Sequence, residues 1–121
     1  FLNSIDIDIG GMSGAEGWNL PSFNASCLGK WSIVLNSTSH KDWATKENCI
    51  LIEPDGKEEI YDNMFFHKGA TFNQGSMYTF DEEEFISAME RAELVCKNEN
   101  KEGVSLRDKF TYKNTLERIL E

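Results

Sequence analysis

Three short apolar segments in the first half of the chain constrain its fold more than any other feature. They are residues 5–9 (IDIDI), residues 31–36 (WSIVLN) and residues 49–54 (CILIEP). The first alternates apolar and acidic residues with a period of two, and the other two are rich in β-branched residues, so all three are predicted to be strands. Short crossover connections between such strands favour parallel pairing within an α/β layer.

Helical patterns separate these segments. After a loop that contains Gly10, Gly11 and Gly14, a helix is predicted from about Leu20, with a proline in its first turn and Gly29 at its end. A second, shorter helix is predicted over residues 40–46, capped by Ser39. The first half of the chain is therefore expected to run strand, helix, strand, helix, strand.

The second half is helical after an irregular stretch. Residues 57–80 hold several aromatic residues without a clear period, which predicts a loop packed by its own aromatic side chains. Asp81 with Glu84 resembles a capping box and predicts a helix start, and Thr111 is placed to cap a final helix. We expect one α/β domain over residues 1–121, with a Rossmann-like parallel sheet of about three strands flanked by helices.

Charge and cysteine usage exclude several classes of function. The net charge of −9 makes nucleic acid a poor partner, and no apolar run approaches the roughly 20 residues of a membrane span. Cys27, Cys49 and Cys96 are too widely spaced for a zinc site and odd in number, so buried thiols in a reducing, cytoplasmic compartment are expected. His40 and His67 have no third ligand at metal spacing, and His40 is predicted to lie at the surface.

The residues that follow the first predicted strand suggest a binding site. They read GAEGWNLP (residues 14–21) and lead directly into the first helix. The carboxyl end of a parallel strand beside a helix N-terminus is where ligands bind in open α/β sheets, and the free N–H groups there can hold a diphosphate. Glu16 would repel phosphates but can accept hydrogen bonds from sugar hydroxyls, and the Asn24 amide can bind ribose hydroxyls.

At this point the sequence resembles a known family. The order of motifs is similar to the donor site of retaining GT-B glycosyltransferases of the group 1 (family 4) type. The resemblance continues through WSIVLN, CILIEPDG and the closing FTYKNTLERIL, and covers most of the chain except residues 57–80, which are longer than usual for the family. The residues that carry the donor motif are Glu16, Gly17, Trp18, Asn19, Leu20, Pro21, Asn24, Ala25 and Gly29.

The resemblance implies a role for each matched residue. Glu16 would be the catalytic-site acid that contacts hydroxyls of the transferred sugar. Asn24 stands where the family usually has a second Glu that grips the ribose, and Asn19 replaces a more usual Gly, which would narrow the sugar pocket. The sugar and diphosphate would be lined by the backbone of Gly14, Gly17, Trp18, Asn19 and Leu20.

The resemblance also implies a reaction and its partners. The full-length enzyme would transfer a sugar from a UDP- or GDP-sugar to a hydroxyl of a glycan, lipid or other acceptor, with retention and without a metal or further cofactor. Because the family's phosphate-binding Arg and Lys and its acceptor domain lie upstream, this chain would be the distal part of the donor-binding domain, inactive by itself. The enzyme is expected in the cytoplasm or at the periphery of a membrane, and an exposed sheet edge can pair with a second copy.

An alternative from another class stays open at this point. The chain can be a non-catalytic α/β interaction module whose aromatic loop docks a partner, and Asn24 in place of a carboxylate favours that alternative. An unrelated Rossmann-type reductase would need a G-x-G-x-x-G motif, which is absent. An open hollow at the tip of the first strand, with Glu16 in it, would favour the enzyme, and a filled tip would favour the module.

Overall fold

The three predicted strands lie side by side in one parallel sheet. In the computed structural model, which describes residues 1–121, the sheet has the order β1-β2-β3. Its strands are β1 (Ile7–Gly11), β2 (Trp31–Leu35) and β3 (Ile50–Ile52), and both pairings are parallel. The α/β class with a three-stranded parallel sheet is therefore confirmed. Strand β1 begins two residues later than expected and includes Gly10 and Gly11, which were predicted to lie in the loop.

The end of β1 carries a bulge. Asp8 pairs with Ser32 and Gly11 pairs with Val34, so three steps along β1 face two steps along β2. The extra residue in β1 disrupts the ladder and bends the strand locally. Glycine is required at the far side of this bulge, because a Cβ at Gly11 would overlap the carbonyl oxygen of Ile33.

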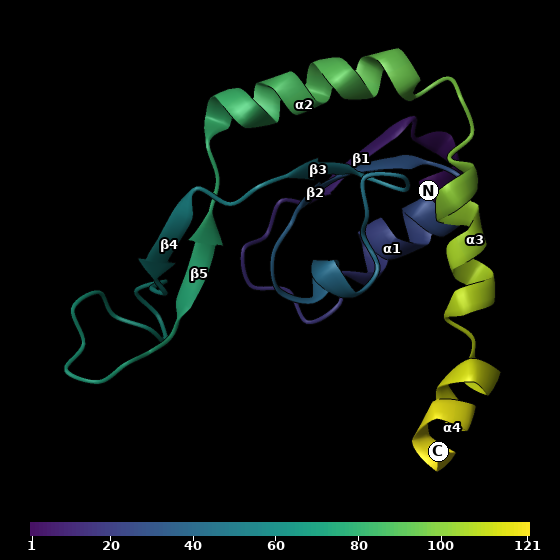
Figure 1. The fold of residues 1–121 in the computed structure, drawn as a ribbon. Coiled ribbons are helices and arrows are strands. Elements are labelled where there is room, and N and C mark those ends of the chain that lie inside the picture. The colour runs from purple at the N-terminus through teal and green to yellow at the C-terminus, as the bar shows by residue number, and fades with distance from the viewer.

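Helices cover both faces of the sheet (Figure 1). Helix α1 (Leu20–Cys27) lies on one face and helix α2 (Glu82–Val95) on the other. Ala88 and Ala92 bring α2 onto the apolar side chains of β2 and β3. On the opposite face, α1 contributes small side chains with no exposed surface, which are Ser22, Ala25 and Ser26.

Helix α3 (Lys101–Lys109) packs against α1 through a very close contact. A Cβ at Gly103 would overlap the carbonyl oxygen of Ser26. The buried Asn100 caps this helix with Oδ1, which accepts the Gly103 N–H at 2.9 Å. Its Nδ2 donates to the carbonyls of Lys30 (2.9 Å) and Asn48 (2.7 Å), so one side chain joins three segments.

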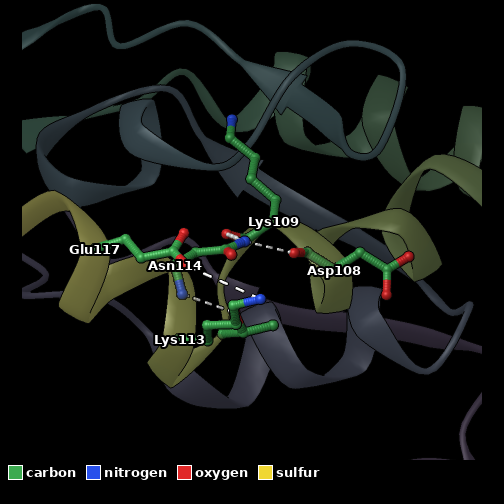
Figure 2. A network of polar contacts seen from close by, with 6 residues as sticks. Asp108, Lys109, Lys113, Asn114 and Glu117 are labelled. Carbon is green, nitrogen blue, oxygen red and sulfur yellow. Dashed lines mark hydrogen bonds and ion pairs between the residues drawn. The ribbon is translucent and has the colours of Figure 1, made fainter.

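Helix α4 (Tyr112–Leu120) continues beyond α3 at the C-terminal end (Figure 1). Thr111 caps it as predicted, because Thr111 Oγ1 accepts the Asn114 N–H at 3.1 Å. Figure 2 shows how the Asn114 side chain closes the end of α3 by donating to the carbonyls of Asp108 (2.8 Å) and Lys109 (3.1 Å). No residue of α4 is buried.

Residues 57–80 differ from the expectation of an irregular loop. Strands β4 (Gly56–Glu59) and β5 (Ser76–Thr79) form an antiparallel pair that projects from the body (Figure 1). The predicted self-packing of the aromatic side chains is also wrong, since Phe65 is 77% and Phe72 68% exposed. Instead, the Asp62 carboxylate orders the tip by accepting the N–H groups of residues 64–66, and bonds from Phe66, Met64 and Phe65 lower its pKa.

The short helix predicted over residues 40–46 is also wrong. A 3-10 helix, η2 (Thr38–Asp42), takes its place, and a second one, η1 (Leu2–Ser4), precedes β1. The Ser39 hydroxyl does not cap η2 and has no hydrogen-bond partner. The chain turns away after Trp43 because the Asn48 side chain accepts the Thr45 N–H and donates to the Trp43 carbonyl. No helix of the protein combines the length and the apolar character that a membrane crossing requires.

Candidate functional site

The loop after β1 enters α1 through Asn19. Asn19 Oδ1 accepts the Ser22 N–H at 3.3 Å, and the helix begins at Leu20 with Pro21 in its first turn, as predicted. The backbone of Asn19 is left-handed, with φ 61° and ψ 66°. Asn tolerates this conformation better than other non-glycine residues because its short side chain can bind nearby groups.

The Asn19 carboxamide is fully used inside the protein. Its Nδ2 donates to the Gly10 carbonyl at the end of β1 (3.0 Å) and lies 3.1 Å from His40 Nε2. The residue is only 8% exposed. The side chain therefore joins β1, α1 and η2 rather than offering its amide to a ligand.

His40 is buried, although the sequence predicted a surface position. Its ring has no exposed surface, and Nδ1 lies 2.8 Å from the carbonyl oxygen of Leu35. A carbonyl can only accept, so Nδ1 carries the proton and Nε2 is the acceptor that faces Asn19. The ring is buried because η2 turns back directly after β2, a tertiary feature that residue type does not indicate.

An open hollow of about 620 Å³ lies beside this junction. Glu16 is half-buried and is the only charged residue that lines it. Its N–H donates to Thr38 Oγ1 at 3.3 Å, and Thr38 is itself left-handed at φ 47°, an uncommon conformation for a β-branched residue. The lining residues are Gly10, Glu16, Gly17, Trp18, Asn19, Leu20 and Pro21.

Four consecutive residues that line this hollow have backbone N–H groups without a partner within the protein. These N–H groups belong to Gly17, Trp18, Asn19 and Leu20. The helix itself supplies only the last of them, because Pro21 has no N–H and the N–H groups of the next two residues bind Asn19. The expected source of free amides is thus corrected: most come from the loop and not from the first helical turn.

Trp18 is fixed from two sides. Its ring packs edge-on against Phe23 (5.6 Å between ring centroids) and Phe110 (5.3 Å). Its carbonyl accepts the indole N–H of Trp43 at 3.1 Å. These contacts hold the middle of the loop against α1 and the end of α3.

Gly14 and Asn24, which were also predicted for the site, lie outside this hollow. Gly14 is buried where β5 crosses the loop, its carbonyl accepts the Tyr78 N–H at 3.1 Å, and a Cβ there would overlap the Tyr78 carbonyl. Gly14 is therefore a packing residue. Asn24 is exposed on α1 and lines a second hollow of about 490 Å³ together with Arg107.

A third hollow connects the two. It measures about 610 Å³ and shares Trp18 and Leu20 with the Glu16 hollow. It also shares Phe23 and Phe110 with the Asn24 hollow. Glu16 and Asn24 thus lie along one series of connected hollows that runs along α1.

The sequence did not indicate a group of buried polar side chains near α1, which includes Asp8, Ser22, Ser26 and Cys49. Asp8 Oδ2 and Ser22 Oγ are buried without a hydrogen-bond partner. Burial, with a smaller contribution from the charge of Asp8, raises the pKa of the nearby Cys49 to about 12, although a hydrogen bond with Ser26 lowers it. No three His, Cys, Asp or Glu side chains gather closely enough to hold a metal ion.

Comparison of the chain with known proteins does not identify a relative. No protein-family model matches it, and neither a curated protein nor a solved structure does. The function is therefore inferred from the geometry of the site and from the motif that lies in it. Five of the predicted residues meet at the hollow, namely Glu16, Gly17, Trp18, Asn19 and Leu20.

Proposed function

We propose that this chain is the distal part of the donor-binding domain of a retaining GT-B glycosyltransferase of the group 1 type. It binds a nucleotide sugar at the Glu16 hollow. The observation that carries the proposal is that one open hollow is lined both by Glu16 and by four consecutive residues, Gly17 to Leu20, whose N–H groups have no partner within the protein.

The N–H groups suit the diphosphate. Successive backbone amides around a left-handed residue form a concave anion site, and the adjoining helix dipole adds positive potential. Such a site needs no Lys or Arg, and none lines this hollow. It explains how a chain with a net charge of −9 can accept an anion.

Glu16 suits the sugar and orients it. A carboxylate accepts two hydroxyl hydrogen bonds but repels phosphate, so the diphosphate must lie toward Gly17–Leu20 and the hydroxyls toward Glu16. In the full-length enzyme, the bond between the anomeric carbon and the diphosphate oxygen breaks. The acceptor oxygen forms the new bond, and its proton leaves with the released diphosphate.

The conformation of Asn19 further supports the resemblance. The related motif usually has Gly at this position, and φ 61° is a region that glycine adopts freely and Asn tolerates. The replacement is therefore compatible with the same loop shape. Asn24 can reach the ribose along the connected hollows, with a neutral amide in place of the family's carboxylate.

The direct test is a calorimetric titration with UDP- and GDP-sugars. Glu16→Gln should weaken binding of the nucleotide sugar about tenfold, because a charge-assisted acceptor is lost, and should leave binding of the free nucleoside diphosphate unchanged or stronger. Glu93→Gln on the exposed surface of α2 makes the same charge change as a control. No binding of any nucleotide sugar, in a chain extended by the upstream half, would contradict the proposal.

A second variant tests the backbone contacts. A Cβ at Gly17 would meet no atom within 4 Å, so Gly17→Ala should leave the free protein intact. If the diphosphate approaches this backbone, the added methyl group should weaken both the nucleotide sugar and the free diphosphate. Unchanged affinity for both ligands would place the ligand elsewhere.

A second candidate function is the interaction module. It is favoured by the apolar tip between β4 and β5, where Met64, Phe65 and Phe72 are 72%, 77% and 68% exposed. Phe65→Ser should leave nucleotide-sugar binding unchanged if the tip and the Glu16 hollow act independently. Loss of a protein partner in that variant, together with no nucleotide-sugar binding by the native chain, would favour the module.

A further inference from the structure

The buried His40 ring connects the carboxyl end of β2 with the loop that carries the free amides. It has no exposed surface and cannot contact a ligand in the hollow. Its two nitrogens bind the Leu35 carbonyl on one side and the Asn19 carboxamide on the other. Any effect of His40 on the site must therefore pass through Asn19.

We propose that His40 is a positioning residue for this site. As the neutral Nδ1–H tautomer it holds the Asn19 carboxamide, keeps Asn19 left-handed, and thereby keeps the N–H groups of Gly17–Leu20 aligned for an anion. The proposal rests on the proposed function for the identity of the ligand, but the coupling between His40 and the loop exists without any ligand.

The orientation of every group in this chain of contacts is determined by its neighbours. The Ser22 N–H must meet an acceptor, which fixes Oδ1 of Asn19 toward the helix. Nδ2 then faces the Gly10 carbonyl and His40 Nε2, so Nε2 must be the unprotonated nitrogen. The Leu35 carbonyl requires a proton on Nδ1, which gives the same tautomer from the opposite side.

Any other state of the ring breaks this arrangement. The Nε2–H tautomer, or the doubly protonated ring, would set an N–H against the Asn19 NH₂ group. Turning the Asn19 carboxamide over would restore that contact. It would, however, set the Asn19 NH₂ group against the Ser22 N–H and the Asn19 side-chain oxygen against the Gly10 carbonyl. Asn19 would then lose the contacts that offset its unfavourable backbone conformation.

A double-mutant cycle with Asn19→Gly tests the proposal. Glycine is left-handed without help, so it removes the need for a held carboxamide while preserving the loop conformation. His40→Phe alone should lower the affinity for the UDP- or GDP-sugar about tenfold, whereas in the Asn19→Gly background it should change the affinity less than about twofold. His40→Gln, which keeps an acceptor near Nε2, should recover part of the loss.

Amide NMR of the ligand-free protein supplies a readout that does not depend on the ligand. His40→Phe should shift the resonances and speed the hydrogen exchange of Gly17, Trp18 and Leu20 only when Asn19 is present. Equal effects of His40→Phe in both backgrounds, or unchanged loop amides, would overturn the proposal. If the loop amides respond but no nucleotide sugar binds the native protein, the proposed function fails and the positioning role stands.

The ring nitrogens give a measurement that needs no substitution. In the native protein, ¹⁵N shifts should show His40 Nδ1 protonated and Nε2 unprotonated. The opposite tautomer would contradict the proposal even if His40→Phe cannot fold.

Discussion

Two buried asparagines perform the same task at opposite ends of the sheet. Asn19 binds the carboxyl end of β1, and Asn100 binds the carbonyl of Lys30, just before β2 begins. Each caps a helix and also donates to segments distant in sequence. A carboxamide suits this task because it has a donor and an acceptor end, whereas Asp can only accept when ionised.

Asn100→Asp should therefore be destabilising in a pH-dependent way. The new carboxylate would keep the cap to Gly103 but would face the carbonyls of Lys30 and Asn48, which favours its protonated form and raises its pKa in the folded state. Relative to the native protein, the variant should be most stable at low pH, below the pKa of this group in the unfolded chain, and should lose about 2–3 kcal/mol in total as pH rises through the folded pKa. Urea unfolding across this range measures it.

The control for that prediction is Asn100→Ala. It leaves the two carbonyls without a donor at every pH, so its deficit relative to the native protein should stay constant. A deficit of Asn100→Asp that is likewise constant would show that the carbonyls do not act on the carboxylate.

Cys49 gives a prediction for alkaline pH. Burial raises the pKa of its thiol from 9.0 to about 12 in the folded state, so folding disfavours the thiolate. The native protein should therefore keep its stability below pH 9 and lose about 2 kcal/mol between about pH 9 and pH 10.5 through this group. Cys49→Ala should lack that loss, and parallel pH profiles of the two proteins would contradict the assignment.

Residue types indicated the loop of the site but not its internal bonding. Glu16, Gly17 and Trp18 were expected at the hollow and lie there. His40 was expected at the surface, and the Asn19 side chain was expected to narrow the pocket. Neither expectation included the hydrogen bond between Asn19 and His40. These residues lie about 20 positions apart, so their contact depends on the turn of η2 and not on a local sequence pattern.

At the scale of elements, sequence periodicity predicted the helices and strands that bury one face. An apolar pattern or a capping residue indicates the position of four elements, which lie close to where they were expected: α1, α2, α4 and β2. Strand β4 was missed because all four of its residues are exposed and charged or glycine, without alternation. Its pairing with β5 is what makes it a strand.

The close contact between α1 and α3 predicts a change in stability opposite to the one that helix propensity alone would give. Alanine is a better helix former than glycine by about 1 kcal/mol, so Gly103→Ala would stabilise an isolated helix. In this protein the added Cβ would overlap the Ser26 carbonyl and the Asn100 side chain, so we expect a net destabilisation of about 2 kcal/mol or more. Thermal unfolding of Gly103→Ala measures the sign, with Gly17→Ala as the uncrowded control.

At the scale of the whole molecule, charge opposes compactness. Among 33 charged side chains the structure forms one ion pair, Lys113–Glu117 at 3.9 Å, and both partners are exposed. Self-repulsion from the net charge of −9 should be screened by salt. The free energy of unfolding should rise by about 1 kcal/mol between about 20 mM and 500 mM NaCl at neutral pH.

That rise should shrink as the carboxylates become protonated. At about pH 5 the net charge is smaller, so the same salt addition should have a weaker effect. A response to salt that does not change with pH would point to a general solvent effect and not to charge repulsion.

The α/β class of the whole molecule could be predicted from the sequence, because parallel strands with helical crossovers allow few arrangements.

Because of the bulge between Asp8 and Gly11, the shape of the hollow depends on the number of residues in this part of β1. Deleting one residue there would restore a regular ladder, but it would also retract the end of β1 by about 3.3 Å. The Gly10 carbonyl would then withdraw from Asn19. A related sequence that lacks this single position should therefore also lack the contact between the Gly10 carbonyl and Asn19, even where the rest of the motif is retained.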